Sequence, residues 1–510
     1  MTDLIGPYST ATAMLEALRS RRVSSRELVQ MHLDRIEAID GGLNAIPVRT
    51  PERAIEAARR ADEATMEGQT APLLGLPMTL KESTLVAGLP QTAGIPGLKE
   101  YRPQADGPIA ASVFAAGACL LGKTNIPVAL GDWQADSPVY GRTNNPWSLD
   151  RTPGGSTGGG AAALAAGMTP LEVGSDIGGS IRVSAAYCGV YGHRPSTTAV
   201  PRAGAFPYGD LQSAGSVMGV QGPLARSAAD LELLFNVIAG PAAGEDVAWR
   251  LALPSSRHER LGDFRVAVMP APPWVSPAAE MQAKVEGLCR FLSRQGAKVA
   301  EAMPALDQDQ YFRDYLCLLI VETSAGQARE GREASARRHA AEPSILAAQA
   351  DGYTLDAAGH IALLRRRELA REAWRQFFTE WDVLIGPMAL DAAFPHQEGE
   401  HETRVLQVDG AEVPYMMNVI HSMWAIYTGQ PSTAFPAGLN SAALPLGLQA
   451  IGPYLEDRTT LRFAQLLERE WQSFQPPPGL TGEVALSRDA GYDRSTLNIA
   501  TGSVYACKRR

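Results

Sequence analysis

The chain has 510 residues, of which 45% are hydrophobic and 20% charged, so it is long enough to bury a large core. Its net charge of −9 and the lack of a Lys/Arg cluster argue against nucleic acid or a membrane surface as a partner. No apolar run reaches the ~18 residues of a membrane span, and Met1–Thr10 lacks a secretion signal pattern.

The five cysteines are scattered, odd in number and not grouped with histidines at zinc-binding spacing. This usage is typical of reduced thiols in the cytosol rather than of a disulfide framework. We therefore expect a cytoplasmic protein that needs no metal and no other cofactor.

The first 70 residues predict a helical layer. Apolar positions recur at helical spacing over 10–20 and 25–39, and Ser24 or Ser25 is suited to cap the second helix. A third helix is expected over 51–67, where Pro51 stands near the first turn. The charged faces of these helices are expected to be solvated.

An apolar run, Leu74 to Leu80, leads into Lys81 and predicts a buried strand end. A lysine in an arbitrary sequence is usually a surface charge, and one that is buried needs a partner. Lys81 is therefore a candidate functional residue.

Residues 117–124 satisfy the phosphate-loop pattern GxxxxGK[ST]. A true phosphate loop follows a strand and opens into a helix. Here a helix-like run, 108–116, comes first, the apolar residues between the glycines resemble a strand, and Pro127 opposes a following helix. We reject a nucleotide-binding interpretation. Residues 128–150 are turn-rich and are expected to form a loop.

The stretch 151–195 contains two glycine-rich turns, 154–160 and 178–180, each followed by a run that can form a helix. Glycine lets the backbone reach positive φ or approach a ligand closely. Unpaired N–H groups at a helix start attract negative charge. Ser156 and Ser180 lie in these turns, which suggests a site that stabilises a developing oxyanion.

The second half of the chain alternates strands and helices, which predicts an α/β architecture. Its expected elements are a helix ending near 238, a strand at 264–269, a helix at 277–295, strands at 297–301 and 381–387, and a helix at 457–471. A run rich in Met and aromatic residues, 414–427, is more typical of a core than of a ligand site. Near the mouth of a pocket, the same run is suited to hold an apolar substrate.

A serine nucleophile needs a base within hydrogen-bond reach. Residues 154–158 match the G-x-S-x-G elbow of Ser-His-Asp hydrolases, but the elbow requires a preceding strand and Arg151–Pro153 does not form one. The base in those hydrolases is a histidine. A buried neutral lysine is a second possible base. A different nucleophile, the Cys188 thiol, is a third possibility, but its apolar surroundings favour an inert thiol.

The sequence resembles the amidase signature family. The resemblance covers most of 10–470 and is strongest over 75–230 and 430–450. It rests on four motifs: Gly-Leu-Pro-Met-Thr-Leu-Lys at 75–81, Gly-Gly-Ser-x-Gly-Gly at 154–159, Gly-Ser-Asp-Ile-Gly-Gly-Ser-Ile-Arg at 174–182, and Cys-Gly-Val-x-Gly at 188–192.

The resemblance implies a Ser-cis-Ser-Lys triad. By motif position Ser180 is the nucleophile, Ser156 in a cis peptide relays the proton, and Lys81 is the base. The oxyanion hole is implied at the N–H groups of Ile177, Gly178, Gly179 and Ser180. Substrate contacts are implied at Leu130, Gly131, Trp133 and Thr157, whereas Asp176 and Arg182 are expected to brace the loop.

The family also implies one large domain, an α/β fold with a mixed twisted sheet covered by helices on both faces. We divide it into an N-terminal helical layer (1–70), the signature core (71–240), a remainder with a variable substrate-access region (241–474) and a C-terminal tail (475–510). The sequence departs from the common motifs at Glu82, Ser184 and 193–196.

The sequence thus predicts a serine hydrolase that cleaves amides through an acyl-enzyme, with an apolar or aryl small-molecule substrate. Esters, anilides and carbamates are further candidate substrates because the same acyl transfer serves them. A homodimer is compatible with this function.

The main alternative is a glutaminase-like component of a tRNA-dependent amidotransferase complex. The departures at 131–137 and 193–196 favour a stand-alone enzyme, and the complete triad argues against a non-catalytic binding protein.

Overall fold

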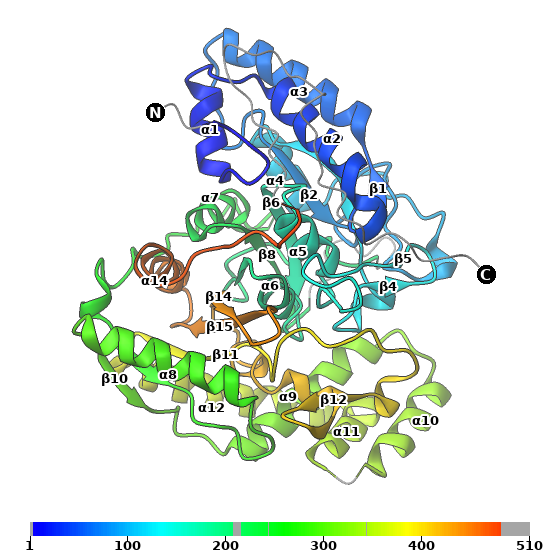
Figure 1. Cartoon of the computed structure of the whole chain (residues 1–510). Helices are drawn as coiled ribbons and strands as arrows, with labels where there is room; N and C mark the ends of the chain where they lie inside the picture. The colour runs from blue at the N-terminus through cyan, green and yellow to red at the C-terminus, as the bar shows by residue number, and fades with distance from the viewer. Residues whose placement is uncertain (1–3, 208–215, 243, 343, 481–510) are drawn as a thin grey trace.

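The computed structural model describes residues 4–207, 216–242, 244–342 and 344–480. They form a single α/β domain around one large mixed sheet (Figure 1). The eleven strands of this sheet lie in the spatial order β1 (Val48–Arg49), β3 (Cys119–Thr124), β2 (Pro77–Lys81), β6 (Leu171–Asp176), β8 (Val220–Ala225), β7 (Tyr191–Arg194), β14 (Ser432–Leu439), β15 (Pro445–Ile451), β11 (Val383–Pro387), β9 (Arg265–Val268) and β10 (Lys298–Glu301).

Parallel pairing is confined to two regions of the sheet. Strand β2 runs parallel to both β3 and β6, and β9 runs parallel to both β10 and β11. The strands between these regions, from β6 to β11, pair antiparallel. Lys81 is the last residue of β2, so it lies at the carboxyl end of a parallel group, where α/β folds commonly place their ligands.

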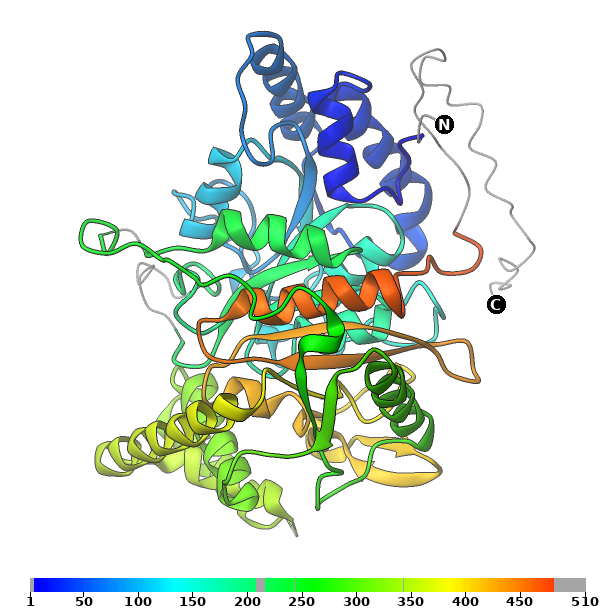
Figure 2. The same cartoon turned by 90° about the vertical axis from the view of Figure 1, so that its left-hand side faces the viewer.

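Helices cover both faces of the sheet and both of its ends (Figure 1). They are α1 (Ala11–Arg19), α2 (Ser25–Leu43), α3 (Pro51–Met66), α4 (Pro108–Ala115), α5 (Gly158–Ala165), α6 (Arg182–Cys188), α7 (Ala228–Ile238), α8 (Ala279–Arg294), α9 (Gln308–Ser324), α10 (Arg329–Ala340), α11 (Gln349–Thr354), α12 (Ala357–Glu380), α13 (Met423–Ile426) and α14 (Asp457–Glu470). The N-terminal helices lie at one end of the molecule and α8 to α12 at the other, while α14 lies along β14 and β15 (Figure 2).

The sheet separates two hydrophobic cores. Met78 and Leu80 of β2, and Leu171 and Val173 of β6, belong to the core that contains α1, α7 and α14. Because successive side chains of a strand point to opposite faces, the residues between and after them face the other core, which contains α5 and α6. Lys81 therefore points to the α5 side.

The three helices expected in the first 70 residues are present, and local signals explain where α2 and α3 begin. The side chains and backbones of Ser24 and Glu27 form a reciprocal capping box at the start of α2. This helix continues past the predicted residue 39 to Leu43, where Asn44 adopts the left-handed conformation that ends it. Pro51 is the first residue of α3, as predicted.

The rejection of a phosphate loop is also confirmed. Strand β3 runs through the second half of the motif, including Gly122, Lys123 and Thr124, and α4 precedes it, which is the reverse of the strand–loop–helix order. The predicted strands and helices of the second half are present within one or two residues. Two short hairpins, β4–β5 (Asp136–Ser137, Gly141–Arg142) and β12–β13 (Val405–Val408, Ala411–Pro414), complete the strands.

The described part of the chain contains no helix long and apolar enough to cross a membrane. Of the predicted tail, 475–510, the segment from 481 onward lies outside the described residues. The last described residue, Leu480, is held through its carbonyl by Tyr8 and Arg35.

Candidate active site

Lys81 lies fully buried among hydroxyl groups. Its Nζ donates to Ser156 Oγ at 2.7 Å, to Ser175 Oγ at 3.0 Å and to Thr157 Oγ1 at 3.1 Å. No carboxylate lies within hydrogen-bond distance of this amine among the described residues. An ammonium in this position would have only neutral acceptors around it, so the environment favours the neutral amine.

Burial lowers the pKa of Lys81 from its usual value near 10.5 to about 7. Attraction to Glu172, and to a smaller extent to Asp176, opposes this effect. A lysine with this pKa is partly neutral at pH 7 and can accept a proton.

The turn that presents Ser156 depends on glycine at two positions. Gly154 has φ +83°, and the Gly155–Ser156 peptide bond is cis. A Cβ on Gly155 would lie 2.3 Å from Asp132 O, so the backbone of the 131–134 loop packs directly on this peptide. A Cβ on Gly154 would lie 2.7 Å from Ser184 Cα, so the same turn also contacts α6.

The second glycine-rich turn is held by Asp176. Its carboxylate accepts from the N–H of Gly179 at 3.0 Å and from Arg182 Nε at 3.0 Å, and both charged side chains are fully buried. Arg182 also donates to Gln449 Oε1 and to Ser422 O, which fixes the turn to β15 and to the segment before α13. The expected bracing by Asp176 and Arg182 is present.

Two carbonyl groups of the same turn are held from outside it. Trp133 Nε1 donates to Gly178 O at 2.9 Å, and the Tyr315 hydroxyl of α9 donates to Ile177 O at 3.2 Å. The turn is thus fixed through two of its carbonyls. Its N–H groups at Ile177, Gly178 and Ser180 have no backbone acceptor in the described part of the chain.

Ser180 lies two residues before the start of α6 and is 6% exposed. Its hydroxyl makes no hydrogen bond to another described residue, in contrast with that of Ser156. The first turn contacts α6 through Gly154, so the two glycine-rich turns flank the same short helix.

The sequence profile of the family described as Amidase matches residues 27–461, and this match spans most of the chain. The chain belongs to the amidase family. Its relatives include two proteins that are named as components of glutamyl-tRNA(Gln) amidotransferase. The one from Chloroflexus aggregans is 32% identical and aligns over 93% of this chain and 99% of its own length. The one from Thermus thermophilus is 33% identical, over 88% and 94%.

Solved structures of this family share the fold. A bacterial aryl acylamidase has a TM-score of 0.76 at 25% identity, with 91% of this chain and 96% of that chain covered. A 6-aminohexanoate cyclic dimer hydrolase has a TM-score of 0.75 at 25% identity, with 93% and 99% covered. These similarities confirm the mixed α/β fold expected of an amidase.

The loop residues proposed as substrate contacts of this amidase occupy different environments. Ala129 and Leu130 have positive φ, and Leu130 and Gly131 are at least partly exposed. Trp133 is buried, and its ring lies 5.4 Å from that of Tyr415. The Thr157 hydroxyl accepts a hydrogen bond from the Lys81 amine.

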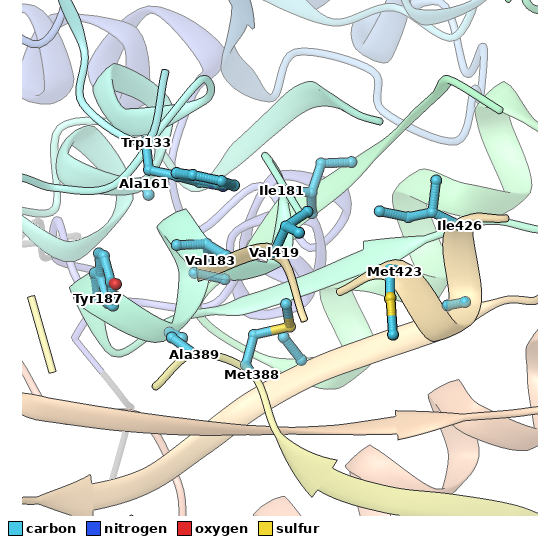
Figure 3. Close-up of a cluster of buried hydrophobic side chains, with 14 of the residues drawn as sticks. Trp133, Ala161, Ile181, Val183, Tyr187, Met388, Ala389, Val419, Met423 and Ile426 are labelled. Carbon is cyan, nitrogen blue, oxygen red and sulfur yellow. The ribbon is translucent and has the colours of Figure 1, made fainter. Parts of the chain in front are cut away.

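The Met- and aromatic-rich run 414–427 is mostly buried core, as its composition favoured, although Pro414 is exposed and Met416 is half-buried. Val419, Met423 and Ile426 lie in one apolar cluster with Trp133 and Val183 of α6 (Figure 3). The cluster therefore extends from the predicted pocket loop to the helix that follows Ser180.

Sequence reasoning missed three residues of the site: Glu172, Ser175 and Tyr315. Ser175 lies inside the motif that contains Ser180, so its place there gave a signal that its hydroxyl belongs to the site. Glu172 was detectable as a charge between two apolar residues, Leu171 and Val173. Tyr315 lies on α9, far along the chain, and no local pattern marks it.

The structure also argues against the two alternative sites, a Cys188 nucleophile and a Ser-His-Asp hydrolase elbow. The Cys188 thiol is fully buried and donates to Pro153 O, and burial raises its pKa, so the thiolate is disfavoured. Arg151 forms only an isolated bridge with Pro395, so no strand precedes Ser156 as the hydrolase elbow requires.

Proposed function

We propose that this amidase hydrolyses carboxylic amides through an acyl-enzyme on Ser180, with Ser156 as the relay and Lys81 as the base. The observation that carries the proposal is the buried Lys81 amine, which lies 2.7 Å from Ser156 Oγ and has no carboxylate bound to it among the described residues. This arrangement supplies the activating base that a serine nucleophile requires.

In the proposed first half-reaction, Ser180 Oγ attacks the amide carbon while its proton passes through Ser156 to Lys81. The C–N bond then breaks, and the proton returns by the same route to the leaving nitrogen. In the second half-reaction, water gives a proton to Lys81 and attacks the ester carbonyl. The bond to Ser180 Oγ then breaks, and the proton passes from Lys81 through Ser156 to Ser180 Oγ, which releases the acid and restores the serine and the neutral amine.

The developing oxyanion is assigned to the backbone of the second turn. Ile177, Gly178 and Ser180 supply N–H groups without a backbone acceptor in the described part of the chain. The Gly179 N–H, proposed from sequence as a fourth donor, is engaged by Asp176 at 3.0 Å. The geometry supports three donors more directly than four.

The proposed substrate is a small molecule with an apolar or aryl group. The support is the apolar cluster around Trp133 and Val183 beside the second turn (Figure 3) and the similarity to the aryl acylamidase structure. Esters, anilides and carbamates are further candidates because they undergo the same acyl transfer. We expect a stand-alone cytoplasmic enzyme, active as a monomer or a homodimer.

A second candidate function is that of a glutaminase-like component of a tRNA-dependent amidotransferase. Relatives with that name, more than 30% identical over nearly the whole chain, favour it. The two functions differ in one requirement: the amidotransferase component would need a second chain and glutamine, whereas the stand-alone enzyme would turn over an aryl amide by itself.

The deciding experiment is intact mass measurement after incubation with a fluorophosphonate, for the wild type and for Ser180→Ala. We expect one adduct on the wild type and none on the variant. An adduct that persists in Ser180→Ala would assign the nucleophile to another serine, with Ser156 next to be tested. A wild type that is labelled only after a partner chain is added would favour the amidotransferase complex.

A further inference from the structure

Glu172 is a charged residue inside the sheet, close to the level of Lys81. It pairs with Thr79 of β2, while Leu80 pairs with Val173. Thr79 and Lys81 are two residues apart on β2, so their side chains point to the same face, and Glu172 points to that face with them. The carboxyl group and the Lys81 amine thus occupy the same layer, between the sheet and α5.

The surroundings of Glu172 are shaped to hold a carboxyl group. Its Oε1 accepts from Thr124 Oγ1 at 2.7 Å, and Thr124 is the register partner of Lys81 on β3. A Cβ on Gly160 of α5 would lie 2.6 Å from both Cγ and Oε1 of Glu172, so the helix needs glycine there. The side chain is fully buried.

The second oxygen of this carboxyl group, Oε2, has no hydrogen-bond partner among the described residues. A buried carboxylate with one free oxygen is costly, whereas the neutral acid is tolerated. Burial accordingly raises the pKa of Glu172 to about 7, and the nearby hydroxyls of Thr79 and Thr124 and attraction to Lys81 oppose the rise.

The charged groups that act on this pair are few. Glu172 and Asp176 act on Lys81, with Glu172 the stronger, and Lys81 acts on Glu172. Helix α5, which covers both, consists of glycine, alanine and leucine and brings no charge. Strand β3 contributes the Thr124 hydroxyl.

We propose that Glu172 is a positioning residue whose protonation is linked to that of Lys81 across the layer that both occupy, and that it so sets the pH range in which Lys81 acts as a base. The proposal rests on the function proposed above. The two groups are not hydrogen-bonded to each other, so the link is electrostatic and no proton passes directly between them. A proton that arrives at Lys81 from Ser180 through Ser156 is held more firmly beside the Glu172 carboxylate than beside the Glu172 acid.

The pair has a distinct signature in a pH profile. With Glu172 anionic, Lys81 holds its proton more tightly, and with Glu172 neutral it releases the proton more easily. The rate of the wild-type reaction falls toward low pH, and this part of the profile, the acid limb, is therefore spread over two linked protonations. In Glu172→Gln the limb should be a single protonation, displaced to lower pH by about one unit, which is about a tenfold gain in rate at pH values below the wild-type midpoint.

The measurement is the rate of fluorophosphonate labelling of Ser180 as a function of pH. Thr124→Val is a second variant that removes only the hydroxyl donor to Glu172. Since this disfavours the carboxylate, it should shift the limb in the same direction and by less. Glu468→Gln is the matched control: burial raises the pKa of Glu468 to about 7 as well, but its carboxylate accepts from Ala228 N–H. Its profile should coincide with that of the wild type.

A second readout does not depend on the reaction. Infrared difference spectra of the wild type minus Glu172→Gln should show a protonated carboxyl band that disappears as the pH rises through neutrality. Normal labelling in all variants with superimposed pH profiles would overturn the role of Glu172. An absence of labelling in the wild type would instead overturn the proposed function, while the infrared band would still report the Glu172 proton.

Discussion

Two regions of the sheet each bury a lysine with a glutamate, and the two pairs differ in how well the glutamate is bonded. Lys123 of β3 is attracted electrostatically by Glu82, whose carboxylate accepts from the N–H groups of Thr92 and Ala93 and from the Tyr140 hydroxyl. At Lys81 of β2 the partner is Glu172, which accepts a hydrogen bond from Thr124 and has one oxygen without a partner among the described residues.

The two lysines also differ in their hydrogen-bond acceptors and in their pKa. Lys123 donates to a backbone carbonyl, that of Pro90, and burial lowers its pKa to about 8. Lys81 donates to three hydroxyls, and burial lowers its pKa to about 7. A buried pair whose anion is fully hydrogen-bonded holds the fold, whereas a pair with an incompletely bonded anion leaves the lysine free to exchange a proton.

Replacing each lysine by methionine gives the largest expected contrast. Lys81→Met should lower the labelling rate of Ser180 by about 100- to 10,000-fold, the usual contribution of a general base. Lys123→Met should leave the reaction nearly intact but lose about 3–5 kcal/mol of stability, since it strands the Glu82 charge. Labelling kinetics and urea unfolding of the two variants measure this. Equal losses of reactivity in both would refute the distinction.

The glutamates provide the next contrast. Glu82→Gln should lower the free energy of unfolding by about 1.5–3 kcal/mol, because an amide group would face donors that now bond to a carboxylate. Glu172→Gln should change stability by less than Glu82→Gln does, because one of its oxygens has no donor to lose among the described residues. Urea unfolding at pH 8 compares the two variants. A greater loss of unfolding free energy in Glu172→Gln than in Glu82→Gln would contradict the view that Glu82 is the better bonded of the two glutamates.

The pH dependence of the wild type follows from the shift of Lys81. Lys81 must be neutral to accept a proton, and its pKa is lowered to about 7. Labelling should therefore increase as the pH rises through about 7 and fall by about tenfold for each unit well below that value. A limb near pH 10, about the value of an ordinary lysine, would show that the amine is not the base.

The smallest effects are expected at the side chains that hold the second turn. Trp133→Phe removes the donor to Gly178 O, and Tyr315→Phe removes the donor to Ile177 O. Each variant should slow labelling by about 2- to 10-fold, the value of one net hydrogen bond. The midpoint of the pH profile should not move in either variant, since neither side chain donates to or accepts from Lys81.

The local sequence determined much of this protein. Periodicity and capping placed α1 to α3, as shown by Ser24 and Pro51, because these signals act over a few residues. The glycine-rich turns and the apolar run before Lys81 marked the site, since glycine is needed where backbones approach closely, as at Gly155. The resemblance to a family added the order of the motifs and the proposed triad, for which spacing alone left several possibilities open.

Tertiary structure decided the partners of those residues. Lys81 and Glu172 lie 91 positions apart along the chain (172 − 81), and only the parallel pairing of β2 with β6 brings them to one face. Tyr315 reaches the second turn from α9, and Gly160 makes room for a carboxyl group that no local pattern connects with it. Local sequence sets the conformation of each segment, whereas the proton affinity of a side chain depends on burial and on partners that only the packed sheet and helices supply.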